Sequence, residues 1–383
     1  MEKKITVVIP ALNEWKVIKY AVARAFEAFK KYWVKWQCLI MDSSNDGWVT
    51  KRAAEELGAE VVSIWRQWLW KAYIDSISHI TWDYVVMWDA DGTYDFIEMD
   101  WFIKKLDEWY DFVMGSRLRW NIHKWAMPWK NRYIGTPLLT AMINIFFNTK
   151  ISDCNSWLRA LTLDAFKKIK LESWGWEYAS EMVIKGKLCN LKMCEIPVSL
   201  LADRDGRKPH LPAWAAWWAN MRYIMLLASE FIFLKVGFIV SLIWLLILVS
   251  QIFGPFTIWW ITFGTFYIFL GILLSNIWFS VLQMGVLTQN FSYINQFRIT
   301  SVSKKIKSIF TFERGLLMGI WFLAAWLLLD WFVFFQRLQT HQIGILSFKI
   351  WLYALFLITT SIQIIYFSFM FFLFNKYSSE GWK

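Results

Sequence analysis

Glycine is scarce in this sequence. The chain of 383 residues contains 17 glycines, about 4%, whereas an average usage of about 7% would give roughly 27. Tryptophan, which is normally among the rarest residues, occurs 29 times. A deficit of about ten glycines is therefore matched by a surplus of tryptophan.

Zinc-type cysteine spacing and nucleic-acid motifs are also missing. The four cysteines (Cys38, Cys154, Cys189 and Cys194) lack that spacing, so we interpret them as reduced and structural. The N-terminal sequence MEKKITVVIPALNE has no long apolar segment, which argues against a signal peptide. The net charge of +11 comes with no basic helix or nucleic-acid motif. We therefore expect the positive charge to serve contacts with anionic lipid and phosphorylated substrates rather than with nucleic acid.

Charged residues become rare after about Arg222. Hydrophobic residues make up 57% of the chain, above the roughly 45–50% of soluble proteins, and this favours a soluble domain followed by a membrane region. Each of the apolar stretches there is long enough to cross a bilayer as a helix: about 231–253, 257–281, 316–335 and 345–374. A buried helical domain of a soluble protein is the alternative, but stretches this long with so few charges argue against it.

The positive charges between these stretches predict an orientation. The link between the second and third stretches carries several cations, which are Arg298, Lys304, Lys305, Lys307 and Arg314. By the positive-inside rule this link is cytoplasmic, and an even number of spans then places both chain ends there. We therefore expect an integral protein of the cell membrane with a cytoplasmic catalytic domain.

The segment before the first apolar stretch has a different character. Residues 212–230 mix aromatic side chains with Arg222 at helical spacing, as expected for an interfacial helix that lies along a membrane. A simple connector helix is the alternative. The predicted organisation is thus a domain over 1–211, an interfacial helix over 212–230 and a membrane domain over 231–375.

The first 90 residues alternate between strand and helix patterns. Short apolar runs predict strands at KKITVVIP, WQCLIMD, AEVVSI and YVVMW. Between these strands, apolar residues have helical spacing over residues 14–33, over the stretch TKRAAEELG and over residues 71–80. Such alternation indicates βαβ units and a mostly parallel sheet. Because ligands bind beyond the carboxyl ends of parallel strands, the turns PALNE, DSSNDG and DADG should converge on one site.

Two aspartates in the last of these turns predict a metal site. Asp89 and Asp91 are hard oxygen ligands, which suit Mg²⁺ or Mn²⁺ better than zinc. Asp42 can accept hydrogen bonds from a base or ribose, and Asn13 and Glu14 can orient a nucleotide. Ordinary turn formation is the alternative for Asn13 and for Asn45.

At this point the sequence resembles a known family. It is similar to family-2 glycosyltransferases with the GT-A fold, and more narrowly to the membrane-attached dolichol- and polyprenyl-phosphate glycosyltransferases. The matching motifs, in the family's order, are VVIPALNE, DSSNDG, DADGTYD, GSR (115–117), SDCNSWLRA (152–160), EYASEMVIK (177–185) and DGRKPHL (205–211). The motif Q-x-x-R-W of processive synthases is absent, which argues against a polymerase.

The resemblance implies a reaction and its components. A single sugar would pass with inversion from a UDP- or GDP-linked donor to a polyprenyl or dolichyl phosphate, and Mg²⁺ or Mn²⁺ on Asp91 and Asp89 would neutralise the leaving diphosphate. Asp153 lies where the family has a carboxylate near the reacting carbon, to orient the acceptor or act as base; a helix N-cap is the alternative. Pro10 and Lys71 are the remaining candidates for the donor. Candidates for the acceptor phosphate are Arg117, Arg132 and Arg207, because arginine binds phosphate in a bidentate way; an ordinary surface arginine is the alternative for each.

Other functions stay open at this stage. A non-catalytic membrane scaffold or flippase-like protein with a degenerate transferase domain is one alternative. Transfer to a non-phosphorylated lipid such as diacylglycerol is another. The sequence leaves both the sugar and the oligomeric state, including a homo-oligomer, undecided.

Tryptophan stands at several positions where the family tends to have glycine. These positions are Trp68, Trp70, Trp88, Trp120, Trp125, Trp157 and Trp217. Glycine serves such turns because it adopts positive φ and permits close backbone approach. We hypothesise that UGA codons read as glycine in the source organism are written here as tryptophan, and we predict low activity for the chain with tryptophan. Drift in an inactive homologue and deliberate substitution are the alternatives.

Overall fold

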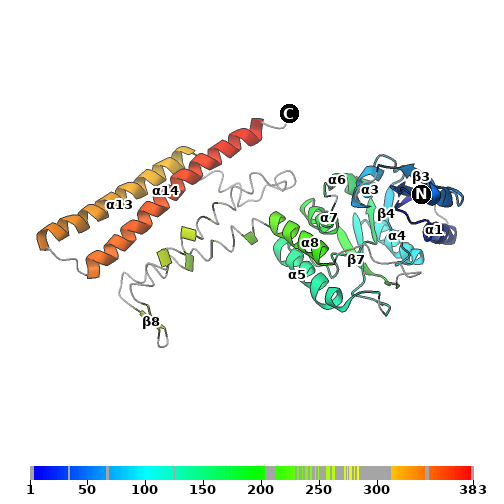
Figure 1. The fold of residues 1–383 in the computed structure, drawn as a ribbon, viewed down its shortest axis with the longest axis horizontal. Coiled ribbons are helices and arrows are strands. Elements are labelled where there is room, and N and C mark those ends of the chain that lie inside the picture. Colours follow the sequence, from blue (N-terminus) through cyan, green and yellow to red (C-terminus); the bar gives the residue numbers. More distant parts are fainter. Residues whose placement is uncertain are drawn as a thin grey trace. The chain divides into compact units, whose positions relative to one another are not determined.

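The chain folds into two compact units, residues Met1–Leu226 and Leu227–Lys383. Figure 1 shows a computed structural model of the chain. It describes residues 4–32, 35–65, 69–124, 126–173, 175–202, 213–228, 312–340 and 345–380, with shorter stretches between 231 and 283.

The first unit is built on a seven-stranded sheet with the strand order β3-β2-β1-β4-β6-β5-β7. The strands are β1 (Lys4–Ala11), β2 (Lys35–Asp42), β3 (Glu60–Ser63), β4 (Tyr84–Met87), β5 (Phe112–Ser116), β6 (Arg159–Thr162) and β7 (Met193–Pro197). Only β6 runs antiparallel to its neighbours β4 and β5. The predicted α/β domain with a mostly parallel sheet is confirmed.

Helices surround this sheet (Figure 1). They are α1 (Ile18–Tyr32), α2 (Val49–Glu55), α3 (Leu69–Ser76), η1 (Phe96–Glu98), α4 (Met99–Asp107), η2 (Asn131–Gly135), α5 (Thr136–Phe147), α6 (Leu163–Lys168), α7 (Tyr178–Leu188) and α8 (Ala213–Leu227). After its first residue, β1 is buried along its whole length, as a parallel strand covered on both faces should be. The helix predicted over 14–33 begins at Ile18, and the one predicted over 71–80 ends at Ser76.

Several helices end in the same backbone motif. At the end of α2, Gly58 adopts φ +87° and the Ala59 N–H donates to the Ala54 carbonyl at 3.3 Å. At the end of α4, Trp109 adopts φ +65° and the Tyr110 N–H donates to the Lys105 carbonyl at 3.3 Å. This is the Schellman motif, in which the left-handed position normally belongs to glycine. Trp109 therefore occupies a glycine position that the sequence comparison with the family did not single out.

The second unit contains two long helices, α13 (Phe312–Thr340) and α14 (Ile345–Glu380). Gly319 accepts a hydrogen bond at its carbonyl from Ser361 Oγ at 2.7 Å, and a Cβ on Gly315 would collide with Ser368. These contacts show antiparallel packing through small residues, as in many membrane helix pairs. The stretches Glu313–Gln336 and Ile350–Met370 are long and apolar enough to span a membrane, in agreement with the last two predicted spans.

The first two predicted spans have a different outcome. The stretch 257–281 begins in a hairpin of β8 (Phe256–Ile258) and β9 (Ile261–Phe263), so a helix is wrong at its start. Most of 231–253 and most of 264–281 lie outside the described residues, as do residues 298–307 of the basic link; the described positions of the second stretch from 271 to 280 are helical. The membrane orientation stays a prediction.

Candidate active site

The three predicted strand-end turns lie at one edge of the sheet. β1 is parallel to both β2 and β4, and the register pairs Ala11 with Asp42. Asp89 and Asp91 follow β4 directly. The strand-end turns therefore meet at the carboxyl edge, where parallel sheets bind ligands.

The first two turns are joined by their asparagines. Asn13 Nδ2 donates to Asn45 Oδ1 at 2.9 Å, and the Asn45 N–H donates to Asn13 Oδ1 at 3.0 Å. Asn13 also adopts φ +58°, a left-handed conformation in which asparagine is enriched. The alternative of turn formation accounts for both side chains.

The other donor-site candidates lie around this turn. Asp42 is buried, and one of its carboxylate oxygens accepts the Ser44 N–H at 3.0 Å. Pro10 is buried within β1, and the Glu14 carbonyl accepts the N–H groups that begin α1. Lys71 on α3 pairs with Asp75 on the same helix at 2.7 Å.

The metal candidates form a tight turn. Asp91 Oδ1 accepts the Thr93 N–H at 3.0 Å and the Thr93 hydroxyl at 2.8 Å, and Gly92 adopts φ +72°. Among the described residues no group of three or more His, Cys, Asp or Glu side chains could hold a metal. A pair of carboxylates still fits Mg²⁺ or Mn²⁺, because such ions complete their coordination with water and substrate phosphates. Asp89 and Asp91 would be the residues that hold it.

Trp88 lies directly beneath this turn. Its side chain is 1% exposed and stacks on Phe96 with ring centroids 3.8 Å apart. Its carbonyl accepts a hydrogen bond from the Tyr73 hydroxyl at 3.0 Å. The indole Nε1–H is buried and has no hydrogen-bond partner among the described residues, which costs about 1–3 kcal/mol. Tryptophan thus fills the core here at the expense of an unsatisfied donor.

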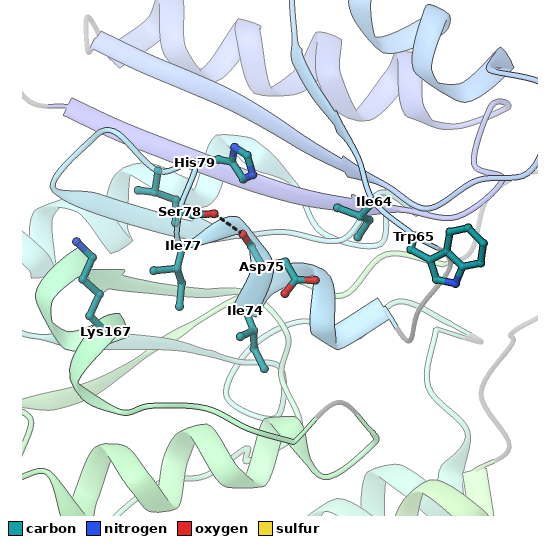
Figure 2. Close-up of a pocket in the computed structure, with 9 residues that line it drawn as sticks. Ile64, Trp65, Ile74, Asp75, Ile77, Ser78, His79 and Lys167 are labelled. Atoms are coloured by element: carbon teal, nitrogen blue, oxygen red, sulfur yellow. Dashed lines mark hydrogen bonds between the residues drawn. The ribbon is translucent and has the colours of Figure 1, made fainter. Parts of the chain in front are cut away.

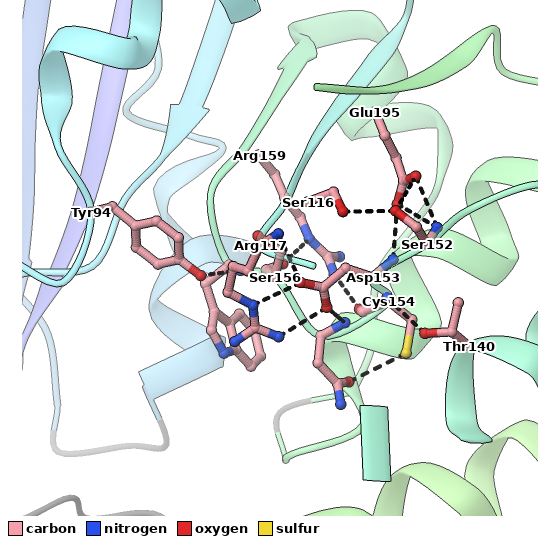
Figure 3. A network of polar contacts seen from close by, with 12 residues as sticks. Tyr94, Ser116, Arg117, Thr140, Ser152, Asp153, Cys154, Ser156, Arg159 and Glu195 are labelled. Atoms are coloured by element: carbon pink, nitrogen blue, oxygen red, sulfur yellow. Dashed lines mark hydrogen bonds and ion pairs between the residues drawn. The ribbon is translucent and has the colours of Figure 1, made fainter. Parts of the chain in front are cut away.

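The GSR and SDCNSWLRA motifs meet in an ion pair (Figure 3). Arg117 Nε and Nη2 donate to the two carboxylate oxygens of Asp153 at 2.7 and 2.9 Å, and the Arg117 backbone N–H donates at 3.1 Å. Burial alone would lower the pKa of Arg117, but the Asp153 charge outweighs it and raises that pKa above its ordinary value. The two residues hold each other in a bidentate geometry that favours the charged forms.

The helix N-cap alternative for Asp153 is wrong. Asp153 Oδ1 accepts the Asn155 N–H at 3.1 Å, but residues 154–158 form a turn and an extended segment rather than a helix. The aspartate therefore caps a turn in the loop that leads to β6.

Arg159 is a site residue that the sequence analysis did not predict, although it lies inside the motif SDCNSWLRA. Its buried guanidinium donates to the carbonyls of Cys154, Ser156 and Ala179 at 2.8–2.9 Å. Burial lowers its pKa to about 10. The arginine at the first position of β6 is the only signal for this role, which is to fix the loop that carries Asp153.

The turn that carries Asp89 and Asp91 (the metal turn) and the loop that carries Asp153 (the Asp153 loop) are attached to neighbouring strands of the sheet. The register of β4 and β6 pairs Met87, two residues before Asp89, with Arg159. Tyr94 completes the connection, because its hydroxyl accepts the Trp157 N–H at 3.4 Å. Figure 3 shows Tyr94 reaching towards Arg117 and Ser156. The structure thus brings Asp89, Asp91, Arg117 and Asp153 into one region.

Arg132 and Arg207 are not part of this network in the described residues. Arg132 lies on η2, where its Cζ is 5.4 Å from the centroid of the Tyr133 ring. Arg207 lies outside the described residues. Their role at an acceptor phosphate stays a prediction.

The tryptophans at family glycine positions differ in backbone conformation from two other tryptophans of the chain. Positive φ is found at Trp48 (+70°) and Trp109 (+65°), and not at Trp88, Trp120 or Trp157. Trp217 also has ordinary φ, and Trp68 and Trp125 lie outside the described residues. The conformational argument for glycine therefore holds at two tryptophans that the family pattern did not indicate.

A separate cavity of about 850 Å³ lies beside α3 (Figure 2). It is lined by Ile64, Trp65, Ile74, Asp75, Ile77, Ser78, His79, Ile80 and Lys167. The lining begins after β3 at Ile64 and Trp65 and continues along α3 to residues 77–80, which precede β4, and it includes none of Asp89, Asp91, Arg117 and Asp153.

Comparison with known proteins identifies the family. Residues 6–170 match the profile of glycosyl transferase family 2. Over 246 residues the chain is 31% identical to the low-salt glycan biosynthesis hexosyltransferase Agl6 of Haloferax volcanii, covering 64% of this chain and 59% of that protein. It is 29% identical over 175 residues to the glycosyltransferase AglJ of the same organism, covering 45% of this chain and 56% of AglJ. The chain thus spans less than two thirds of either relative.

Two further similarities carry less information about function. An uncharacterized protein of Methanocaldococcus jannaschii, MJ1222, is 30% identical over 207 residues, which cover 52% of this chain and 82% of that protein. Glucosyl-3-phosphoglycerate synthase from Mycobacterium tuberculosis superposes with a TM-score of 0.47 at 19% identity, over 58% of this chain and 79% of that chain. Residues 6–170 therefore form a domain of glycosyl transferase family 2, built on the mostly parallel sheet described above.

Proposed function

We propose that this protein transfers a single sugar, with inversion, from a nucleotide-sugar to a polyprenyl or dolichyl phosphate at the cytoplasmic face of a membrane. The observation that carries the proposal is the register of β4 with β6, which pairs Met87 with Arg159. This register brings a two-carboxylate turn, suited to a metal–diphosphate, beside a buried arginine–aspartate pair. Family membership and the hexosyltransferase name of Agl6 support the same reaction class.

The donor half of the reaction belongs to the carboxyl edge of β1, β2 and β4. Asp89 and Asp91 would hold a divalent ion there, which would neutralise the charge that develops on the leaving diphosphate. Asp91 is fixed for this task by its hydrogen bonds to Thr93. Asp42, at the end of β2, is placed for the nucleoside.

The acceptor half needs little basicity. A phosphate monoester has a second pKa near 6 and is largely anionic at neutral pH, so it can attack without losing a proton to a strong base. What the acceptor requires is alignment by cations. Arg117 is our candidate for this alignment, supported by its two guanidinium hydrogen bonds to Asp153, which would hold it in position.

The outer face of the first unit supports a lipid acceptor. On α5 the exposed positions Leu138, Ala141 and Ile145 are all apolar, although the opposite face is buried in the core, and the exposed Ile134 of η2 precedes them. An exposed helix face without polar side chains is unusual in water and is typical of a surface that contacts lipid or another protein.

α8 extends this apolar face. Trp217 Nε1 donates to the Gly135 carbonyl at 3.3 Å and so joins α8 to the start of α5. The exposed side of α8 carries Trp214, Trp218, Arg222 and Met225, the mixture of aromatic and basic side chains typical of an interfacial helix. From Phe112 to Ser152 the sequence contains no acidic residue. We propose that this α5–α8 face (Ile134, Leu138, Ala141, Ile145, Trp214, Trp218 and Met225) lies on an anionic lipid surface.

The test is a transfer assay on the full chain in lipid nanodiscs. A panel of radiolabelled UDP- and GDP-sugars is supplied with polyprenyl phosphate, with Mg²⁺, Mn²⁺ or EDTA. The same assay is run on the variant that carries Trp68→Gly, Trp70→Gly, Trp88→Gly and Trp157→Gly, because the written chain is predicted to be poorly active. We expect a labelled lipid that is released by mild acid, that requires the metal and that is lost in Asp91→Asn.

Each alternative has its own outcome. A labelled lipid that resists mild acid would indicate transfer to a hydroxyl of a lipid such as diacylglycerol. If no labelled lipid forms with any donor, in either the chain with tryptophan or the glycine-restored variant, the proposed enzymatic activity is refuted. A scaffold or flippase-like protein would then be favoured.

A further inference from the structure

Glu195 on β7 lies directly behind the loop that carries Asp153. The Ser152 N–H donates to its carboxylate with both oxygens at 2.8 Å, and the Asp153 N–H donates to Oε1 at 3.0 Å. The Ser152 hydroxyl donates to Oε2 at 2.8 Å. The Glu195 side chain is 2% exposed. A buried carboxylate is thus bound mainly by two successive backbone amides (Figure 3).

These contacts fix the backbone of Asp153 rather than its side chain. The Asp153 carboxylate points to Arg117, which binds it through two guanidinium nitrogens. Its backbone N–H is held from the other side by Glu195. With both ends of the residue anchored, the Arg117–Asp153 pair has little freedom to turn as a unit.

Glu195 is also connected to the strand that carries Arg117. β7 is parallel to β5, and the register pairs Met114 with Glu195. At the end of β5, the hydroxyls of Ser116 and Ser152 are 2.7 Å apart. The single carboxylate thus joins the end of β5 to the Asp153 loop, although the two segments are 36 residues apart in the chain.

Arg119 is a weaker partner of the same carboxylate. Its Nη2 lies 3.3 Å from Glu195 Oε2, but its side chain is 49% exposed. Exposed ion pairs contribute little, whereas hydrogen bonds from amides to a buried charge are among the stronger ones. The backbone contacts, and not the ion pair, are what Glu195 is placed to make.

We infer that Glu195 is a positioning residue for the transfer reaction, acting through the Ser152–Asp153 backbone on the Arg117–Asp153 pair. The inference rests on the proposed function, since the pair is assigned to the acceptor there. Glu195 itself touches no substrate in this scheme. Its loss should therefore slow turnover without weakening the binding of the nucleotide-sugar.

Two substitutions separate positioning from simple packing. Glu195→Ala removes the acceptor for both amides, whereas Glu195→Gln keeps one oxygen that can accept from Ser152 and Asp153. We expect Glu195→Ala to lower kcat at least tenfold with the KM for the nucleotide-sugar within twofold of the parent. Glu195→Gln should restore kcat to within about threefold of it, and Arg119→Ala should stay within twofold. The parent is the glycine-restored full chain in nanodiscs.

Glu98 provides a matched control. Its carboxylate also receives a backbone amide, that of Ser199 at 3.1 Å, just beyond β7 but away from Asp153. Glu98→Ala should leave kcat within twofold. An equal loss of kcat in Glu98→Ala and Glu195→Ala, or an unchanged kcat in Glu195→Ala, would overturn the inference.

A second measurement does not require activity. Hydrogen–deuterium exchange of the peptide over residues 151–157 should be slow in the parent and in Glu195→Gln, and at least tenfold faster in Glu195→Ala. Equal protection in all three overturns the inference even if no sugar is transferred. An inactive parent with faster exchange in Glu195→Ala would instead refute the proposed function and leave Glu195 as the residue that holds this loop.

Discussion

Trp109 ends α4 in the same left-handed conformation with which Gly58 ends α2. In both motifs the N–H of the following residue donates across the helix end at 3.3 Å, from Tyr110 to Lys105 and from Ala59 to Ala54. A side chain in this conformation costs about 1–2 kcal/mol because its Cβ crowds the backbone. The Trp109 side chain is 85% exposed, so little packing offsets that cost.

Trp109→Gly should therefore stabilise the protein. We expect the free energy of unfolding to rise by about 1 kcal/mol, because strain is relieved and little buried area is lost. Urea unfolding of the full chain in detergent, followed by hydrogen exchange of α4, measures the change. Trp101→Gly, also on α4 but at ordinary φ within the helix, is the control and should destabilise by about 1 kcal/mol. A loss of stability in Trp109→Gly would contradict the strain argument.

The same geometry sharpens the decoding hypothesis. Trp48 precedes α2 at φ +70° and directly follows Gly47, which also has φ +70°. Because glycine alone adopts such conformations without cost, we predict UGA codons for Trp48 and Trp109, as for Trp88 and Trp157. Trp129, at ordinary φ, should be encoded by UGG. Sequencing the coding DNA and mass spectrometry of the protein from its source organism check this; UGG at Trp48 and Trp109 would refute it.

The Arg117–Asp153 pair should behave as a coupled unit. Removing one partner of a buried pair leaves an uncompensated charge, which costs about 3–5 kcal/mol. We expect Asp153→Asn to destabilise by about 3 kcal/mol and to lower kcat at least tenfold. Arg117→Lys should also lose activity, since lysine cannot bind both carboxylate oxygens in parallel.

A double-mutant cycle measures that coupling. Arg117→Met with Asp153→Leu should cost clearly less than the sum of the single substitutions. Lys19 and Glu56 form an exposed pair at 2.6 Å and provide the control, because such pairs contribute less than about 1 kcal/mol. Additive losses at Arg117 and Asp153 would show that the two act independently.

Buried thiols predict how stability changes at alkaline pH. Burial raises the pKa of Cys38 and of Cys154 to about 12 from an ordinary value of 9.0. In the unfolded chain these thiols ionise near pH 9, which favours unfolding as the pH rises. Their contribution is thus fully present below pH 9.0 and is lost between that pH and about 12. The free energy of unfolding should fall less steeply over this range in Cys38→Ala than in the parent; identical slopes would contradict the prediction.

The fold was predictable from the sequence where local signals and long-range structure agree. The strands around Val7, Ile40 and Val86 are β-branched, apolar and closed by turn residues, so their order and parallel pairing follow from general rules. β6 was not foreseen, because a four-residue strand beginning with arginine carries no alternating or continuous apolar pattern. Its antiparallel insertion decides what lies beside the metal turn.

The site was predictable as a set of residues but not as a set of contacts. The family motifs indicated Arg117 and Asp153 separately, the first for an acceptor phosphate and the second for the reacting carbon. Their ion pair depends on the register of β5 with β6 and β7, which no local pattern specifies. Glu195 carried no signal at all, because a single glutamate in a strand is ordinary until its amide partners are seen. The left-handed position of Trp109 was not predicted because the glycine that normally signals a helix end is absent there.

The α5–α8 face gives the last prediction. If it lies on the bilayer, a fluorescent NBD label on Ile145→Cys should emit at shorter wavelength in nanodiscs than a label on Lys104→Cys, because Ile145 would lie among lipid and Lys104 of α4 in water. Brominated lipids should quench the first label and leave the second unchanged. Leu138→Glu should reduce that quenching at least twofold, since burying a carboxylate among lipid is costly. If brominated lipids quench the label at residue 145 no more than they quench the label at residue 104, α5 faces water. The acceptor would then have to reach Arg117 without this face.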